Sequence, residues 1–201
     1  MKRRVGIFGG TFSPPHIGHI SAAEGFISAL ELDELVIMPD FLPPHKIFDG
    51  EASTDDRMAM CNLAFGHLPN VVVSDFEIKR GGKSYTAVTL EQLASPDKDL
   101  YFLCGTDMFL TLSSWYKPEI IFKNATICYV RRESDKDNSE LIEKSCKDYI
   151  SRYDAKIIPI SSVVKEISST EIRNSIKKQD NLEQYLTRDV AKYILEKGLY
   201  K

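Results

Sequence analysis

The 201-residue sequence lacks any hydrophobic run long enough to cross a membrane, because its longest apolar stretches span only a few residues. It also lacks the apolar core of a signal peptide, since Val5 to Phe8 is followed at once by two glycines. Its four cysteines include no Cys-x-x-Cys pair. We therefore expect reduced cysteines, with Cys104 and Cys128 in core strands, in a cytoplasmic protein without a membrane partner.

An excess of charge of one sign is also missing. The net charge is −3, so the sequence makes only a weak electrostatic case for nucleic acid, and any phosphate binding must be local. Hydrophobic residues make up 43% and charged residues 27%, as in ordinary globular proteins. The length suits one domain over residues 1–201, with a core over 1–165 and a helical C-terminal part over 166–201.

Short apolar runs alternate with amphipathic stretches along the chain. This alternation predicts an α/β fold, a Rossmann-like doubly wound parallel sheet with a small C-terminal helical segment. The expected strands are 4–8, 34–38, 71–74, 100–104, 125–130 and 156–160. The main expected helices are 17–32, 54–68, a helix from 84, 108–112, 138–153, and 181–199. Ligands of such sheets lie at the carboxyl ends of the strands.

The stretch from Gly9 to His19, Gly-Gly-Thr-Phe-Ser-Pro-Pro-His-Ile-Gly-His, carries the densest polar chemistry in the chain. Gly9 and Gly10 predict a tight turn and a close approach to a bound group. His16 and His19 are three residues apart at a helix start, where free N–H groups suit an anion. A zinc site would need a third ligand, and two histidines could also merely cap the helix. We favour a phosphate cradle in which the histidines donate hydrogen bonds.

A second polar helix start is Ile167-Ser-Ser-Thr-Glu-Ile-Arg173. Ser168 with Glu171 fits a capping box, so an ordinary helix start is well founded. Hydroxyls, backbone N–H groups and the Arg173 guanidinium around the same turn also make an anion site. Paired with the first site, it could hold a triphosphate from two sides.

These two motifs, in this order, resemble those of the His-x-Gly-His nucleotidyltransferase superfamily. The second, Ser-Ser-Thr-x-Ile-Arg, is similar to that of its adenylyl-transferring members, and nearly the whole chain resembles the nicotinate mononucleotide adenylyltransferase branch. The resemblance implies ATP and nicotinate mononucleotide as small-molecule substrates, with nicotinate adenine dinucleotide and pyrophosphate as products. It implies His16, His19 and Arg173 as catalytic residues. It implies ATP contacts from Gly9, Gly10, Thr11, Phe12, Gly18, Gly105, Asp107, Ile167, Ser168, Ser169 and Thr170. It implies contacts to the second substrate from Lys46, Ser84, Tyr85, Thr86, Trp115 and Tyr116.

Several of these residues have a plainer interpretation from the residues alone. Lys46 could be a solvated lysine in a proline-stiffened loop, and Asp107 could cap the helix over 108–112. Ser84 is a plausible N-cap, and Trp115, the only tryptophan, could be a core aromatic. The resemblance instead places Lys46 near phosphate, Asp107 at a ribose and Trp115 against a pyridine ring.

Two positions stand out from their surroundings. Ser13 stands where the resembling family usually has Asp before the proline, which keeps a turn oxygen but loses a charge. Arg57 opposes the helix dipole, and is either offset by Asp55 and Asp56 or faces an anion.

The expected reaction needs no general base, because a phosphomonoester is largely dianionic at neutral pH. Catalysis would rest on positioning and charge neutralisation, with Mg²⁺ arriving on ATP because few carboxylates are placed to hold it. Pantetheine-phosphate adenylyltransferases share the first motif, cytidylyltransferases carry a different second one, and a nucleotide-sensing module would bind without turnover. The oligomeric state, including a homo-oligomer, stays open.

Overall fold

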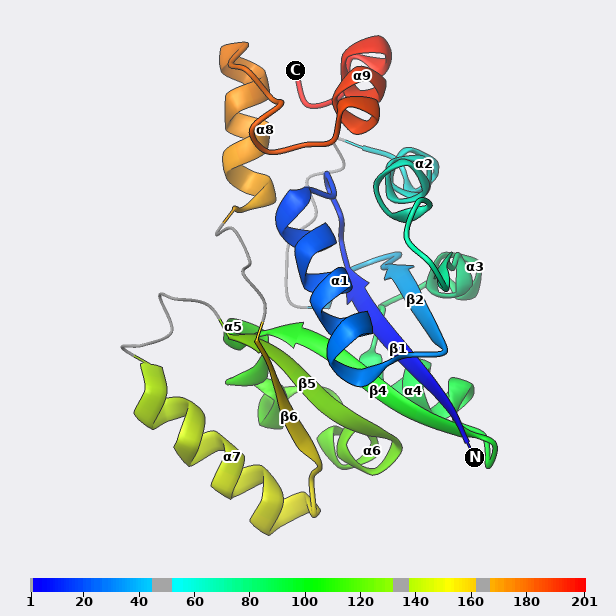
Figure 1. Ribbon diagram of the computed structural model, residues 1–201, viewed down its shortest axis with the longest axis vertical. Helices are drawn as coiled ribbons and strands as arrows, with labels where there is room; N and C mark the ends of the chain where they lie inside the picture. The colour runs from blue at the N-terminus through cyan, green and yellow to red at the C-terminus, as the bar shows by residue number, and fades with distance from the viewer. Residues whose placement is uncertain (1, 45–51, 132–137, 162–166) are drawn as a thin grey trace.

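The computed structural model describes residues 2–44, 52–131, 138–161 and 167–201. Six parallel strands form one sheet in the order β3-β2-β1-β4-β5-β6, as Figure 1 shows. The strands are β1 (Arg3–Gly10), β2 (Glu34–Pro39), β3 (Val71–Val73), β4 (Lys98–Gly105), β5 (Ala125–Arg131) and β6 (Ile157–Ser161). This order confirms the predicted doubly wound fold. Successive strands are added toward one edge from β1 to β3 and toward the other edge from β4 to β6, so the switch point lies between β1 and β4.

Helices cover both faces of the sheet. They are α1 (Ile17–Leu30), α2 (Thr54–Phe65), α3 (Phe76–Arg80), α4 (Thr86–Leu93), α5 (Thr106–Phe109), the 3₁₀ helix η1 (Leu112–Ser114), α6 (Pro118–Asn124), α7 (Ser139–Tyr153), α8 (Ser169–Lys178) and α9 (Arg188–Lys197). One core cluster joins α1, α2, α8 and α9 to the sheet, with Phe26 and Met60 fully buried. The other joins α4, α6 and α7, with Leu90 and Tyr149 at its centre. Burial on both faces explains the near-continuous apolar strands.

Three predicted features of local structure are wrong. The strand does not turn at Gly9 and Gly10, because β1 continues to Gly10 in register with Pro39, and the backbone becomes left-handed at Phe12 (φ 48°). Ser84 is not the cap of α4, whose cap position is Tyr85. The helix expected over 181–199 is restricted to Arg188–Lys197, where Thr187 provides the cap.

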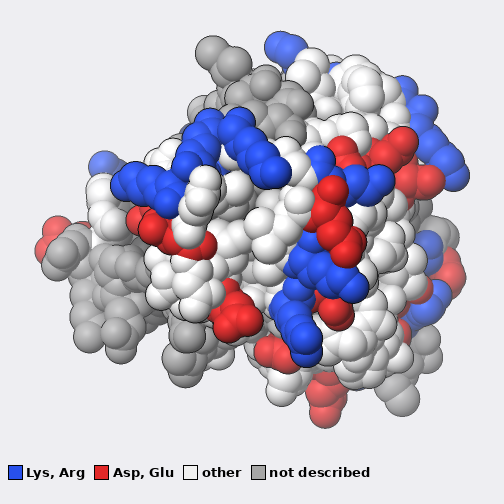
Figure 2. All heavy atoms as spheres, turned by 90° about the horizontal axis from the view of Figure 1, so that it is seen from above, with Lys and Arg blue, Asp and Glu red and all other residues white. Residues whose placement is uncertain are grey.

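Two predictions about side chains are confirmed. Cys104 and Cys128 are buried, and burial raises the pKa of the Cys128 thiol to about 12. The capping box of Ser168 and Glu171 is present at the start of α8. None of the helices in the described ranges is both long and apolar enough to cross a membrane. On the face that carries α8 and α9, acidic and basic side chains are interspersed (Figure 2).

Candidate active site

A cleft of about 500 Å³ opens at the carboxyl ends of the central strands. Its floor comes from the ends of β1, β2 and β4, and its walls from the starts of α1, α4 and α8. The size suits a small-molecule ligand, and the place is the switch point where α/β sheets bind ligands. The lining includes these predicted residues: Gly9, Gly10, Thr11, Phe12, His16, Gly18, His19, Ser84, Thr86, Gly105, Asp107, Trp115, Ile167, Ser168, Ser169, Thr170 and Arg173.

The two histidines hold one another at the start of α1. The Nδ1 atom of His16 accepts a hydrogen bond from the backbone N–H of His19 at 3.3 Å, and the Nδ1 atom of His19 accepts one from His16 at 3.2 Å. Their rings stack with centroids 3.6 Å apart. Since each Nδ1 is an acceptor, each neutral ring carries its proton on Nε2. The histidines are therefore both helix caps and hydrogen-bond donors that line the cleft.

Arg173 reaches the same turn from α8. Its Nη1 donates to the carbonyl of Ser13 at 2.9 Å, and its Nη2 lies 3.3 Å from the hydroxyl oxygen of Thr170. A guanidinium carries five N–H donors in a planar fork, a geometry that suits the recognition of a phosphate. The helix starts at His16 and Ser168 thus converge on one cleft, as the sequence motifs predicted.

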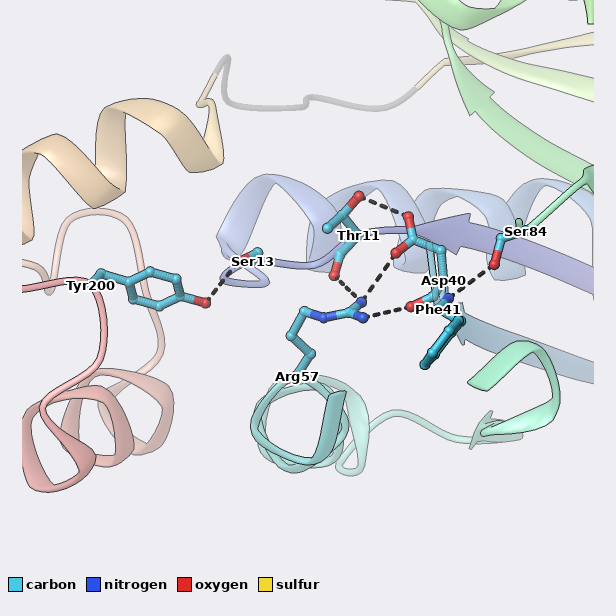
Figure 3. Close-up of polar contacts among 7 residues, drawn as sticks. All are labelled: Thr11, Ser13, Asp40, Phe41, Arg57, Ser84 and Tyr200. Carbon is cyan, nitrogen blue, oxygen red and sulfur yellow. Dashed lines mark hydrogen bonds and ion pairs between the residues drawn. The ribbon is translucent and has the colours of Figure 1, made fainter. Parts of the chain in front are cut away.

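A network around Arg57 ties the ends of β1 and β2 together (Figure 3). Arg57 is fully buried and donates to the carbonyl of Thr11 at 2.8 Å, the carboxylate of Asp40 at 3.2 Å, and the carbonyl of Asp40 at 2.6 Å. The hydroxyl of Thr11 donates to the same carboxylate at 2.8 Å. Of the two alternatives for Arg57, the structure therefore shows the second, because its guanidinium faces an anion, the carboxylate of Asp40.

A buried carboxyl group lies where α3 meets α4. Glu77 accepts a hydrogen bond from the Thr89 hydroxyl, and burial raises the pKa of its carboxyl group above the usual range, against the opposing effects of the Thr89 and Ser84 hydrogen bonds. The hydroxyl of Ser84 accepts a bond from the backbone N–H of Phe41 at 2.9 Å, as Figure 3 shows. Ser84 thus joins the segment after β2 to the start of α4.

The remaining predicted residues fall into four groups. Trp115 lines the cleft, and its indole N–H donates to the Thr111 hydroxyl at 3.2 Å. Tyr85 and Tyr116 are not among the lining residues and contact one another instead, with ring centroids 4.5 Å apart. Lys46 lies outside the described residues. Asp107 is exposed in the first turn of α5, whose cap position is Gly105, so its predicted role as a cap is wrong.

Sequence reasoning missed Asp40, Glu77 and Tyr200. Asp40 directly follows β2, so its position at a strand's carboxyl end was a usable signal, as it was for Asp107. Glu77 and Tyr200 carry no comparable local signal, because their importance arises from contacts with distant segments.

Known proteins are similar to this chain in sequence, and others are similar to it in fold. The cytidylyltransferase-like family matches residues 7–175. A protein of Caldicellulosiruptor saccharolyticus named "Probable nicotinate-nucleotide adenylyltransferase" is 36% identical over 198 residues, which cover 98% of this chain and 99% of that protein. The chain belongs to the nicotinate-nucleotide adenylyltransferase family. A Listeria monocytogenes serotype 4b protein of the same name is 37% identical over 202 residues, covering 100% of this chain and 98% of that one.

Solved structures of the same family have this fold. A Plasmodium falciparum nicotinic acid mononucleotide adenylyltransferase complexed with NaAD matches with a TM-score of 0.77 at 20% identity. The match covers 98% of this chain and 97% of that one. The same Plasmodium enzyme complexed with APC gives a TM-score of 0.76 at 18% identity, with the same coverage. At these identities the likeness shows the fold alone.

Proposed function

We propose that the cleft binds ATP and nicotinate mononucleotide and joins them into nicotinate adenine dinucleotide and pyrophosphate. The observation that carries this proposal is the shared cleft of His16, His19 and Arg173, which come from helix starts more than 150 residues apart. Relatives bearing the name of this activity match the chain over nearly its full length, which supports the same reaction.

The triphosphate of ATP would lie between the starts of α1 and α8. Two imidazole Nε2–H donors and a guanidinium would meet the phosphate oxygens there, together with backbone N–H groups of the two helix starts. The hydroxyl protons of Thr11 and Ser169 are donated to Asp40 and to the carbonyl of Pro14, so hydrogen bonds from these hydroxyls to ATP would require both to turn toward the ligand. Among the residues that the structure describes, a Cβ at Gly9 would contact Met38 and Phe102 alone, at 3.9 and 4.0 Å, which leaves room for a nucleotide to approach the backbone closely. Asp107 would accept hydrogen bonds from the ribose.

The pyridine nucleotide would lie on the side of Trp115, Ser84 and Thr86. The flat indole face suits stacking on an aromatic ring. Backbone N–H groups at the start of α4 would donate to a carboxylate better than to a carboxamide, whose NH₂ group is itself a donor. We therefore propose nicotinate over nicotinamide mononucleotide. Contacts from Lys46, Tyr85 and Tyr116 to this substrate stay predictions.

In the reaction, a phosphate oxygen of nicotinate mononucleotide attacks the α-phosphorus of ATP in line. A new P–O bond forms while the bond from the α-phosphorus to the bridging oxygen breaks, and pyrophosphate leaves with those electrons. The attacking phosphate is already largely dianionic at neutral pH, so no protein base is required. His16, His19 and Arg173 would stabilise the negative charge that builds on the phosphates, which is electrostatic catalysis by preorganised donors.

Mg²⁺ would supply charge neutralisation on the phosphate oxygens when bound. Over the described ranges, the chain has no group of three or more His, Cys, Asp or Glu residues that could hold a metal ion. We therefore propose that the ion enters as a complex with ATP. A cytoplasmic location and a homo-oligomer also stay predictions.

Pyrophosphate release with ATP and a panel of acceptors tests the proposed function. Nicotinate mononucleotide should give the highest kcat/KM, above nicotinamide mononucleotide, pantetheine phosphate and other small phosphates. CTP in place of ATP should give little product. A protein that binds ATP but releases pyrophosphate with none of these acceptors would be a nucleotide sensor and would refute the proposal.

Substitution of one imidazole tests its catalytic role. His19→Ala should lower kcat about 100- to 1,000-fold, the usual effect of removing one donor to a developing charge. His19→Asn is the matched variant, because an amide oxygen can still accept the backbone N–H of His16. If it restores the melting temperature without restoring kcat, the imidazole acts on the reaction rather than on folding. A near-wild-type kcat in both variants would contradict this role.

A further inference from the structure

The turn between β1 and α1, residues 11–16, is held in place by the last part of the chain. The hydroxyl of Ser169 donates to the carbonyl of Pro14 at 3.0 Å, and Arg173 donates to the carbonyl of Ser13 at 2.9 Å. Just beyond the turn, the N–H of Ile17 donates to the carbonyl of Tyr185 at 2.9 Å. Three separate positions of the C-terminal part therefore contact one short segment of the cleft.

Tyr200 adds a fourth contact, which lies behind the cleft. Its hydroxyl oxygen is 3.0 Å from that of Ser13, and either can be the donor (Figure 3). Ser13 is 4% exposed and Tyr200 is 2% exposed, so water is kept from this pair. Burial raises the pKa of the Tyr200 hydroxyl well above its usual range, and the group stays protonated at neutral pH. Buried hydroxyls need partners, and these two provide one for each other.

The backbone at both ends of this contact is left-handed. Phe12, directly before Ser13, has φ 48°, and Tyr200 has φ 63°. Neither residue is glycine, so both conformations are unfavourable on their own and persist because the surroundings hold them. The hydroxyl pair joins these two segments, which lie 187 positions apart in the chain.

The position of Ser13 matters to the reaction because its carbonyl accepts the hydrogen bond from Arg173. His16 caps α1 three residues further on. A shift of Ser13 would therefore move the guanidinium and the imidazoles relative to one another. Small displacements of catalytic groups lower the rate of a reaction strongly.

We propose that Tyr200 is a positioning residue of the proposed adenylyl transfer, which holds the catalytic turn through its hydroxyl contact with Ser13. Tyr200 does not line the cleft, so it acts through Ser13 and not on the substrate. The inference rests on the proposed function for its kinetic consequence, but its structural consequence is independent of it.

The test removes each hydroxyl alone and both together, as Tyr200→Phe, Ser13→Ala and the double variant. Each single variant should lower kcat about 10-fold, with KM for both substrates changed less than about twofold, because geometry rather than binding is disturbed. The double variant should also be about 10-fold slower rather than 100-fold, since the two hydroxyls act as one unit.

Tyr193→Phe is the matched control. It removes a tyrosine hydroxyl from the same part of the chain, but that hydroxyl contacts Asp56 at 2.9 Å and not the turn. It should keep the wild-type kcat. Hydrogen exchange adds a readout without turnover: amides of residues 12–19 should exchange faster in Tyr200→Phe and Ser13→Ala, and at the wild-type rate in Tyr193→Phe.

Three results would overturn the inference: wild-type kcat and exchange in Tyr200→Phe, losses that multiply in the double variant, or an equal loss of kcat in Tyr193→Phe. Failure of the proposed function is a separate result. It would show as a wild-type protein that releases no pyrophosphate with any acceptor, and the exchange measurement would still decide whether Tyr200 holds the turn.

Discussion

His16 and His19 combine a structural role at the start of α1 with the chemistry that we propose for them. Each imidazole uses Nδ1 to accept a backbone N–H at the start of α1, where the N–H of His19 also donates to the carbonyl of His16 at 2.9 Å. The cap places the proton of each neutral ring on Nε2. Capping and the proposed phosphate binding are therefore compatible, because the cap sets the tautomer that the proposed phosphate contact requires.

The buried carboxyl group of Glu77 should make the stability of the protein depend on pH. Burial raises the pKa of its carboxyl group above the ordinary value of 4.5, so the folded state holds this proton more tightly than the unfolded state does. The resulting stabilisation is complete below the ordinary pKa and is lost as the pH rises through the folded-state pKa. Glu77→Gln lacks this loss, so its free energy of unfolding relative to wild type should increase between pH 4 and pH 7.5.

Glu143→Gln is the control for this prediction, because the sign of its effect is opposite. Glu143 is exposed, and its hydrogen bond and ion pair with Lys147 lower the pKa of its carboxyl group. Its small stabilisation is present at neutral pH and is lost as the pH falls. Urea unfolding at several pH values measures both variants. A stability difference for Glu77→Gln that does not change with pH would show that the buried carboxyl group is not harder to ionise than an exposed one.

At the scale of secondary-structure elements, the site depends on how strand ends are joined. Arg57 projects from α2 and bonds Thr11 after β1 and Asp40 after β2, so one side chain links three elements. Its guanidinium is fully buried, and the Asp40 side chain is only 11% exposed. Removal of one member of a buried ion pair lowers the free energy of unfolding strongly, because the charge of the other member stays buried without a partner.

Arg57→Met should therefore lower the free energy of unfolding by about 3–5 kcal/mol, the range for a broken buried pair. Methionine keeps much of the side-chain length, which limits the cavity that forms. Arg152→Met is the matched variant, since Arg152 forms an exposed i,i+4 pair with Asp148 and should cost less than about 1 kcal/mol. Equal losses in the two variants, measured by urea unfolding, would contradict the structural importance given to Arg57.

Elements with strong local signals were predictable, and those set by distant contacts were not. The apolar strands and the Ser168 capping box follow from residues within a few positions of one another. Residues 181–187 carry apolar residues at helical spacing, yet they form no helix, and the Tyr185 carbonyl instead accepts from Ile17. Tertiary contacts thus decided the structure where the local pattern was ambiguous.

At the scale of the whole molecule, the strand order brings the two motifs together. The β1–α1 turn lies at the centre of the sheet, and α8 follows β6 at its edge (Figure 1). Both nevertheless line one cleft. The motifs could be recognised from the sequence, whereas the network of Arg57, Asp40 and Thr11 and the pair of Ser13 and Tyr200 could not, because nothing local indicates contacts across such separations. The division into a core over 1–165 and a C-terminal part over 166–201 stays a prediction.

The central claim is that both helix starts bind the same nucleotide. Hydrogen exchange of the wild-type protein with and without ATP and Mg²⁺ measures this directly, segment by segment. Amides of residues 9–19 and of residues 167–173 should both become protected, over the same range of ATP concentration. Protection of only one segment, with the other exchanging as in the free protein, would contradict the account.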